Sequence, residues 1–134
     1  MAQEIQLRVV TPRRSLLDEP VLEVTGPGTV GEFGVLPNHA AFLTSLEIGR
    51  LSYKDTRGTK HIVVRGGFAE VSDNVMTVLA DAAERAEEID TAKAEKELHA
   101  AEAKLEGLSP LDPGYATADA DRRWAQVRLE TAKR

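Results

Sequence analysis

The first two thirds of the chain consist of short apolar stretches separated by turn residues. At the start, Ile5, Leu7 and Val9 alternate with polar side chains, which is the period of a half-buried strand. Further β-branched runs occupy residues 21–24, 61–64 and 75–79. Glycine, proline, asparagine and aspartate interrupt these runs at short intervals. The pattern predicts a β-sandwich or flattened barrel.

The period changes in the last third, where apolar or small residues recur at spacings of four and three, as on one face of a helix. The first predicted helix carries Ala94, Leu98, Ala101, Leu105 and Leu108 on its stripe. The second carries Tyr115, Ala118, Arg122, Ala125, Leu129 and Ala132. Asp90 is placed to cap the first helix, and the glycines and prolines of residues 107–114 permit a reversal. We therefore predict an antiparallel α-helical hairpin.

Composition divides the chain at the same place. Eight of the 10 glycines lie at or before Gly67, whereas 14 of the 18 alanines lie from Ala80 onward. We predict a β-sandwich over residues 1–86 and a helical hairpin over residues 87–134. Alanine-rich stripes bury little apolar area, so at about 25 cal/mol per Å² the two helices should associate weakly. Straightened, the pair would reach about 60 Å at about 1.5 Å per residue.

Charge and cysteine content exclude several classes of function. The chain has 134 residues with 17 Lys and Arg against 22 Asp and Glu, a net charge of −5, which argues against a nucleic-acid partner. It has no cysteine, and its three histidines show no ligand spacing, so we expect no metal site. It has no apolar run long enough to span a bilayer and no signal-peptide core at its start. We expect it in the cytosol.

One motif imitates a dinucleotide-binding loop. Residues 26–31 satisfy G-x-G-x-x-G after a predicted strand. Such a loop must open a helix that holds the pyrophosphate, yet this segment continues into Gly34 and Pro37. We interpret the glycines as turn residues.

Catalytic residues are not evident in the sequence. No serine lies in a G-x-S-x-G elbow. Glu87, Glu88 and Asp90 form an acidic cluster that suits helix capping better than acid–base chemistry or metal binding. Arg122 interrupts an otherwise small or apolar stripe, either as an arginine extending from a loose helical seam or as a ligand contact. We expect no catalytic residues and a protein that is not itself an enzyme.

Three stretches carry a family resemblance: QLRVVTP at residues 6–12, GEFGVLPNHAAFLTSL at residues 31–46 and VVRGGFAEVSDNVMTVLADAA at residues 63–83. The chain resembles the epsilon subunit of the rotary F-type ATP synthase over essentially its whole length. Ala41 stands where the family usually has a proline. The order of a β-sandwich followed by a helical hairpin is also the family's order.

The resemblance implies a noncatalytic rotor subunit of the central stalk in a proton-translocating enzyme, at the cytoplasmic face of the bacterial plasma membrane and bound to the membrane only through the complex. Its sandwich would bind the gamma subunit and the ring of c subunits. The residues that match the family's contacts with the c-ring and gamma are Gly31, Glu32, Phe33, Leu36, Asn38 and His39.

The resemblance also implies regulation by the hairpin, which in the family either folds back or extends into the catalytic head of alpha and beta subunits and blocks ATP hydrolysis. Arg122, Arg123 and Arg128 would make the inhibitory contact with the head. Some bacterial members bind ATP in the folded hairpin, and the matching residues here are Ile89, Asp90, Lys93 and Arg128. Lys93 replaces an arginine and loses its bidentate fork, so we expect ATP to be at most a weak regulatory ligand.

Two further hypotheses remain open on the residues alone. One is a free-standing cytosolic β-sandwich sensor or adaptor that binds a small ligand and signals through its helices. The other is an enzyme that uses the acidic cluster, for which we find no catalytic constellation. Stable stoichiometric association with other subunits is required only by the rotor hypothesis.

Overall fold

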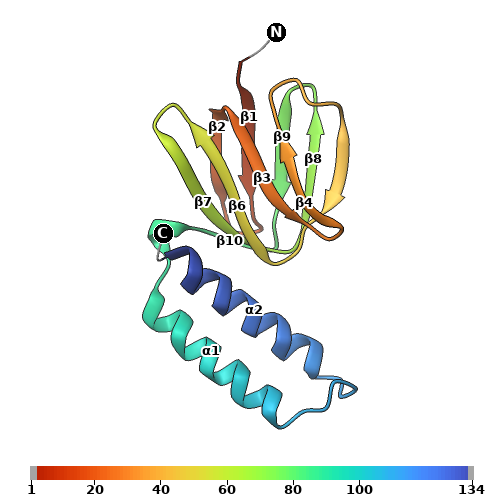
Figure 1. Cartoon of the computed structure of the whole chain (residues 1–134), viewed down its shortest axis with the longest axis vertical. Helices are drawn as coiled ribbons and strands as arrows, with labels where there is room; N and C mark the ends of the chain where they lie inside the picture. The colour runs from red at the N-terminus through yellow and green to blue at the C-terminus, as the bar shows by residue number, and fades with distance from the viewer. Residues whose placement is uncertain (1–2, 133–134) are drawn as a thin grey trace. The chain divides into compact units, whose positions relative to one another are not determined.

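The computed structural model describes residues 3–132, which form two compact units that divide between Arg85 and Ala86. The first unit holds ten strands and the second holds the helices (Figure 1). Ala86 lies in the second unit because it begins the short 3-10 helix η1 (Ala86–Glu88) that precedes the hairpin. No helix among residues 3–132 has the length and apolar character needed to cross a membrane.

The first unit is a β-sandwich of two five-stranded sheets. One sheet has the order β2-β1-β9-β8-β5 and the other has the order β10-β7-β6-β3-β4. The strands are β1 (Ile5–Val10), β2 (Ser15–Val21), β3 (Glu23–Gly28), β4 (Gly31–Val35), β5 (Phe42–Ser45), β6 (Gly49–Asp55), β7 (Gly58–Arg65), β8 (Phe68–Ser72), β9 (Val75–Leu79) and β10 (Ala82–Arg85). The predicted sandwich is confirmed.

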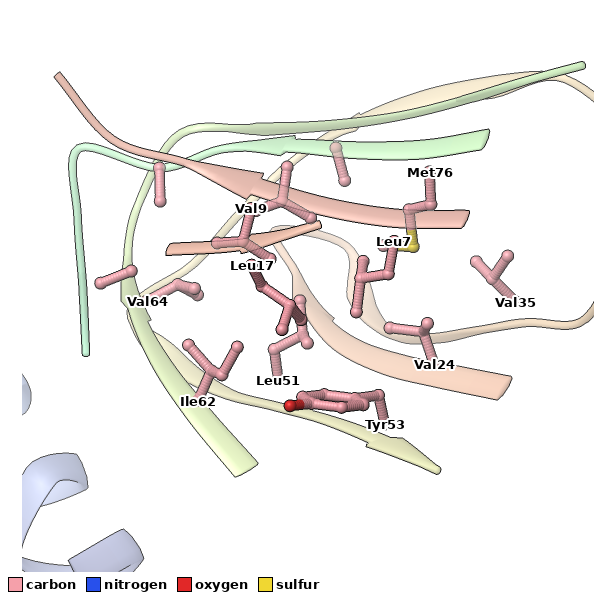
Figure 2. Close-up of a cluster of buried hydrophobic side chains, with 14 of the residues drawn as sticks. Leu7, Val9, Leu17, Val24, Val35, Leu51, Tyr53, Ile62, Val64 and Met76 are labelled. Atoms are coloured by element: carbon pink, nitrogen blue, oxygen red, sulfur yellow. The ribbon is translucent and has the colours of Figure 1, made fainter. Parts of the chain in front are cut away.

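The core lies between the sheets and explains the alternation in β1. Ile5, Leu7 and Val9 are completely buried. Leu7 and Met76 extend into the core from the neighbouring strands β1 and β9, and Leu51 and Tyr53 extend into it from β6 of the other sheet (Figure 2). Each large core side chain contributes about 1.5–3 kcal/mol when it leaves water, so this cluster dominates the stability of the unit.

The predicted strand over residues 21–24 is wrong. Val21 ends β2 in one sheet, Glu23 begins β3 in the other, and Leu22 between them is exposed. Both Val21 and Val24 are buried, because each faces the core from its own sheet. The β-branched run therefore marks the crossing between two sheets and not the centre of one strand.

The second unit is the predicted antiparallel helical hairpin, in which α1 (Thr91–Glu106) packs against α2 (Tyr115–Ala132). The Asp90 side chain caps α1 by accepting a hydrogen bond from the backbone N–H of Lys93, as predicted. Ala94 and Ala101 of α1 are buried, as are Ala118 and Ala125 of α2. Leu108 lies beyond the end of α1, so its assignment to the helical stripe is wrong.

Asp55, at the end of β6, makes the stability of the sandwich depend on pH. Its Oδ1 accepts a hydrogen bond from the backbone N–H of Arg57 at 2.7 Å, and its Oδ2 lies 3.1 Å from Lys60 Nζ. The hydrogen bond from Arg57, followed by the contact with Lys60, lowers the pKa of Asp55 below its ordinary value of 3.8. The associated stability is present above that value and is lost as the pH falls through the folded-state pKa.

We therefore expect Asp55→Asn to flatten the acid-side decline of the unfolding free energy, and to leave a smaller difference between pH 6 and pH 3 than in the wild type. Urea unfolding at a series of pH values measures this. A profile parallel to that of the wild type would contradict the role of Asp55.

Candidate functional site

The tip of the β3–β4 hairpin carries the first predicted contact residues. Gly28 pairs with Gly31 across a two-residue turn, and Val30 in that turn is 94% exposed. Gly31 and Glu32 are also exposed. The tip is anchored to β5 through Thr29, whose backbone N–H donates to Ser45 O and whose hydroxyl lies 2.6 Å from Ser45 Oγ. The sandwich thus holds the tip of the hairpin in place and exposes the apolar Val30 and the charged Glu32 to a partner.

Gly26 is not a turn residue, contrary to the sequence interpretation, because it lies within β3. Phe33 in the facing strand packs over Gly26, where an added Cβ would lie 2.7 Å from Phe33 Cζ. The segment forms a hairpin and not the strand–helix turn that a dinucleotide requires. Residues 31–35 form β4, which is the edge strand of its sheet.

The remaining predicted contacts lie in a turn at residues 36–39. The backbone N–H of His39 donates to Leu36 O at 3.1 Å, and Asn38 between them has a φ of 63°. Leu36 is 58% exposed and His39 is half-buried. The His39 ring lies 5.3 Å from the ring of Phe42, which is 5.5 Å from the ring of Phe33. Phe42 therefore joins the turn to the hairpin.

An apolar patch on the outer face of the sheet that contains β1 was not predicted from the sequence. Phe68 and Leu79 lie directly opposite each other on β8 and β9 and are 56% and 55% exposed. Leu43 on the neighbouring strand β5 is 66% exposed. Val10 pairs with Leu79 from the other side, and a shallow pocket lined by Val10, Phe68 and Leu79 opens there. We call Leu43, Phe68 and Leu79 the outer patch.

A signal for the outer patch existed in the sequence. In β8, buried Ala69 and Val71 alternate with outward-facing positions, and Phe68 occupies one of these. A large apolar side chain at an outward position of an alternating strand indicates an interaction surface when a second one lies beside it. The pairing of Phe68 with Leu79 required the register of β8 and β9.

The arginines of α2 differ from one another in their surroundings. Arg122, which the helical stripe placed at the seam, is half-buried and donates to Asp119 Oδ1 from Nη2 at 2.7 Å and from Nε at 3.2 Å. Arg128 is the buried arginine, only 4% exposed, although it lies off the predicted stripe. Its Nη1 donates to Glu97 Oε2 at 2.7 Å. Arg123 is half-buried.

Arg128 connects the two helices, because Glu97 belongs to α1. The guanidinium also lies 5.5 Å from the centroid of the Trp124 ring, a cation–π distance. Lys93 Nζ is 4.0 Å from Glu97 Oε1, so both Lys93 and Arg128 lie beside one carboxylate. Buried charge is costly without a partner, which makes Glu97 important to the closed hairpin.

The other residues matched to a nucleotide site lie at the start of α1. Asp90 is exposed and serves as the helix cap, and Ile89 is half-buried beside it. Glu87 and Glu88 lie in η1 and are exposed. Among residues 3–132, no group of three or more histidine and acidic side chains is arranged to hold a metal ion.

Comparison with known proteins identifies the family. The family described as ATP synthase, Delta/Epsilon chain, beta-sandwich domain matches residues 4–86. The ATP synthase epsilon chain of Geobacter metallireducens is 47% identical over 132 residues, which cover 98% of this chain and 96% of that one. The chain belongs to the ATP synthase epsilon family. The epsilon chain of Nitratidesulfovibrio vulgaris is also 47% identical, over 96% of this chain.

Solved structures agree with this assignment. A chain of the Euglena gracilis mitochondrial ATP synthase, in a structure of OSCP, F1 and the c-ring, superposes with a TM-score of 0.83. It is 30% identical in sequence, and the match covers 100% of this chain and 84% of that one. A chain of the Tetrahymena thermophila enzyme shares the fold, with a TM-score of 0.64. Membership of the epsilon family thus covers the sandwich and the hairpin alike.

Proposed function

We propose that this epsilon chain is a noncatalytic rotor subunit of the central stalk of a proton-translocating F-type ATP synthase. It couples rotation of the c-ring to ATP synthesis in the head, and its partners are gamma, the c-ring and the alpha and beta subunits. It resides at the cytoplasmic face of the bacterial plasma membrane, held there only through the complex. Support comes from the family and from the similar Euglena gracilis structure, which comprises OSCP, F1 and the c-ring.

The outer patch is the observation that carries this proposal. The sheet exposes three large apolar side chains to solvent, those of Leu43, Phe68 and Leu79. Such a patch favours a permanent protein partner that covers it. Gamma binds this patch in our proposal. Glu32 and its neighbours at the tip of the β3–β4 hairpin contact the polar loops of the c-ring, where a rim charge fixes orientation more than affinity.

Affinity capture of the tagged chain from gently solubilised membranes tests the proposal. We expect gamma, the ring subunits and alpha with beta to be recovered in fixed stoichiometry. Recovery of the folded chain alone would refute the rotor function and favour a free-standing sensor, for which a ligand search would follow. A mock capture from membranes lacking the tagged chain controls for adhesion to the resin.

The hairpin is the regulatory element of the same proposal. Its closed form buries mainly alanines, and the Thr131 hydroxyl is buried without a hydrogen-bond partner. An unsatisfied buried hydroxyl costs about 1–3 kcal/mol. A closed state weakened in this way lies close in free energy to an extended state that reaches the head and inhibits ATP hydrolysis.

Replacing Arg122 and Arg123 with alanine is expected to relieve this inhibition. Each exposed ion pair with the head contributes about 0.5–1 kcal/mol, so losing two shifts the extended population by about 5- to 30-fold. The measurement is the ATP hydrolysis rate of the assembled head. The triple variant that also carries Arg128→Ala should hydrolyse ATP faster than the wild type.

Glu97→Gln is the matched control for the arginine variants. It leaves all three arginines in place but removes the carboxylate that holds Arg128 in the closed hairpin. The extended state should therefore gain population, and hydrolysis should slow. An unchanged hydrolysis rate in the triple arginine variant would contradict the inhibitory contact.

ATP acts as a weak regulatory ligand of the closed hairpin in this proposal. Lys93 and Arg128 each contact one carboxylate oxygen of Glu97, and the backbone N–H of Lys93 donates to the capping residue Asp90. Lysine lacks the planar fork that binds phosphate bidentately, so Lys93→Arg should raise the ATP affinity by about tenfold. Calorimetry with millimolar ATP measures the heat of binding to the full wild-type chain and to the Lys93→Arg variant. Absence of heat from both would rule out the ATP site.

A further inference from the structure

Asn74 occupies a special backbone position between β8 and β9. It is the second residue of the two-residue turn Asp73–Asn74, and the two residues have φ values of 50° and 61°. Positive φ at both central positions is the signature of a type I′ hairpin turn, in which asparagine is favoured. The backbone oxygen of Asn74 accepts a hydrogen bond from the N–H of Gln6 at 3.2 Å. The backbone of Asn74 is therefore held by β8 and β9 on either side of the turn and by the hydrogen bond from β1.

The side chain of Asn74 uses both ends of its carboxamide. Oδ1 accepts a hydrogen bond from the backbone N–H of Asn38 at 2.8 Å. Nδ2 donates to the backbone oxygen of Glu4, also at 2.8 Å. These partners are 36 and 70 residues away in the sequence. One side chain thus joins the β8–β9 turn to the start of β1 and to the turn at residues 36–39.

The turn at residues 36–39 has internal order but needs an external anchor. Pro37 at its second position, Asn38 with positive φ at its third and the hydrogen bond from His39 to Leu36 O are the features of a type II turn. These features fix the shape of the turn and not its place on the sandwich. The hydrogen bond from the Asn38 N–H to Asn74 attaches the turn to the β8–β9 hairpin, and the contact of the His39 ring with Phe42 attaches it to β5.

We propose that Asn74 is a positioning residue for the partner contact made by the turn at residues 36–39. It holds Leu36 and His39 on the rigid β8–β9 hairpin before the partner arrives. A pre-ordered contact avoids the entropy cost of ordering on binding, which raises affinity without adding a contact. This inference rests on the proposed rotor function for the identity of the partner, gamma together with the c-ring.

Two variants of Asn74 and one variant of its neighbour Asp73 separate the effects of the two side-chain hydrogen bonds from the effect of the turn conformation. Asn74→Gly keeps the positive φ but loses both side-chain hydrogen bonds. Asn74→Asp keeps the acceptor for Asn38 and loses the donor to Glu4. Asp73→Gly, at the other left-handed position of the same turn, is the control, because the Asp73 side chain is exposed. All three changes leave the β8–β9 turn able to form.

The first measurement is amide hydrogen exchange in the full chain. In Asn74→Gly the amide of Asn38 should exchange at least about tenfold faster, while the amides of β8 and β9 stay protected. Asn74→Asp should retain protection at Asn38, and Asp73→Gly should match the wild type. The second measurement is affinity for the isolated gamma–c-ring assembly, which should fall about tenfold in Asn74→Gly only.

Two results would overturn the positioning role. One is unchanged exchange at Asn38 in Asn74→Gly. The other is faster exchange with wild-type affinity, which would show that the order of the turn does not matter to the partner. If the wild-type chain itself failed to bind gamma and the ring, the proposed function would be refuted together with this inference. If Asn74→Gly does not fold, hydrogen exchange of the wild-type chain provides the test, because an Asn38 amide that exchanges as fast as an unprotected amide would also overturn the role.

Discussion

Replacing Phe68 with serine and Leu79 with threonine is expected to weaken binding to gamma by about 100-fold. Each side chain is a little more than half exposed, so covering it by a partner recovers about 1–1.5 kcal/mol, half of the value for full burial. The two losses together correspond to about two powers of ten in affinity. Titration of gamma with the purified chain, followed by calorimetry, measures the change.

The fold should tolerate these two substitutions. Both side chains point away from the core, and both replacements are suited to outward-facing strand positions. We expect the urea unfolding midpoint to stay close to that of the wild type. Leu111→Ser provides the control, because Leu111 is an exposed leucine in the loop between the helices and not in the outer patch. Equal affinities of the double variant and the wild type would disprove docking at the outer patch.

Gly67→Ala is expected to destabilise the sandwich by about 4 kcal/mol. An added Cβ would lie 2.0 Å from the backbone oxygen of Leu79 and 2.8 Å from the Cα of Ala80, and both are backbone atoms that cannot rotate aside as the end of a flexible side chain can. The φ of Gly67 is also +103°, which a residue with a Cβ rarely adopts. Overpacking costs about 1–3 kcal/mol and a strained backbone about 1–3 kcal/mol more. Urea unfolding of the full chain measures the effect.

Two other glycines separate the clash from the backbone strain. Gly34 has no heavy atom within 4 Å of an added Cβ and no positive φ, so Gly34→Ala should change the unfolding free energy by less than about 0.5 kcal/mol. Gly58 has the same open space but a φ of +133°, so Gly58→Ala should show the backbone cost alone. Equal effects at positions 58 and 67 would mean that the close approach of β9 to Gly67 contributes nothing.

Local features of the fold followed from the sequence because their physical causes are local. The alternation in β1 and the cap at Asp90 each depend on neighbours in the chain, and both were predicted correctly. The run at residues 21–24 was misread because sheet membership is decided by distant partners. Val21 pairs with Ile5, whereas Val24 pairs with Val35 and Tyr53.

The candidate site was predicted only in part for the same reason. The turn residues at 36–39 were evident from proline and asparagine, but the outer patch required the register that places Phe68 opposite Leu79. A helical period placed Arg122 at the seam, although the buried arginine is Arg128. The partner that permits its burial, Glu97, lies on the other helix and is invisible to a one-helix pattern.

The parallel pairing of β1 with β9 has a consequence for synthesis of the chain. β1 emerges first from the ribosome, yet its central partner in the sheet is the ninth strand, nearly seventy residues later. Until β9 emerges, β1 has only β2 beside it in this sheet, and its other edge is open to pairing with another nascent chain. Closure over so long a loop is slow, whereas the helical hairpin depends on local contacts and forms quickly. The sandwich is therefore completed only shortly before the hairpin is made, and a chain that stops before Val75 leaves an unfinished sheet.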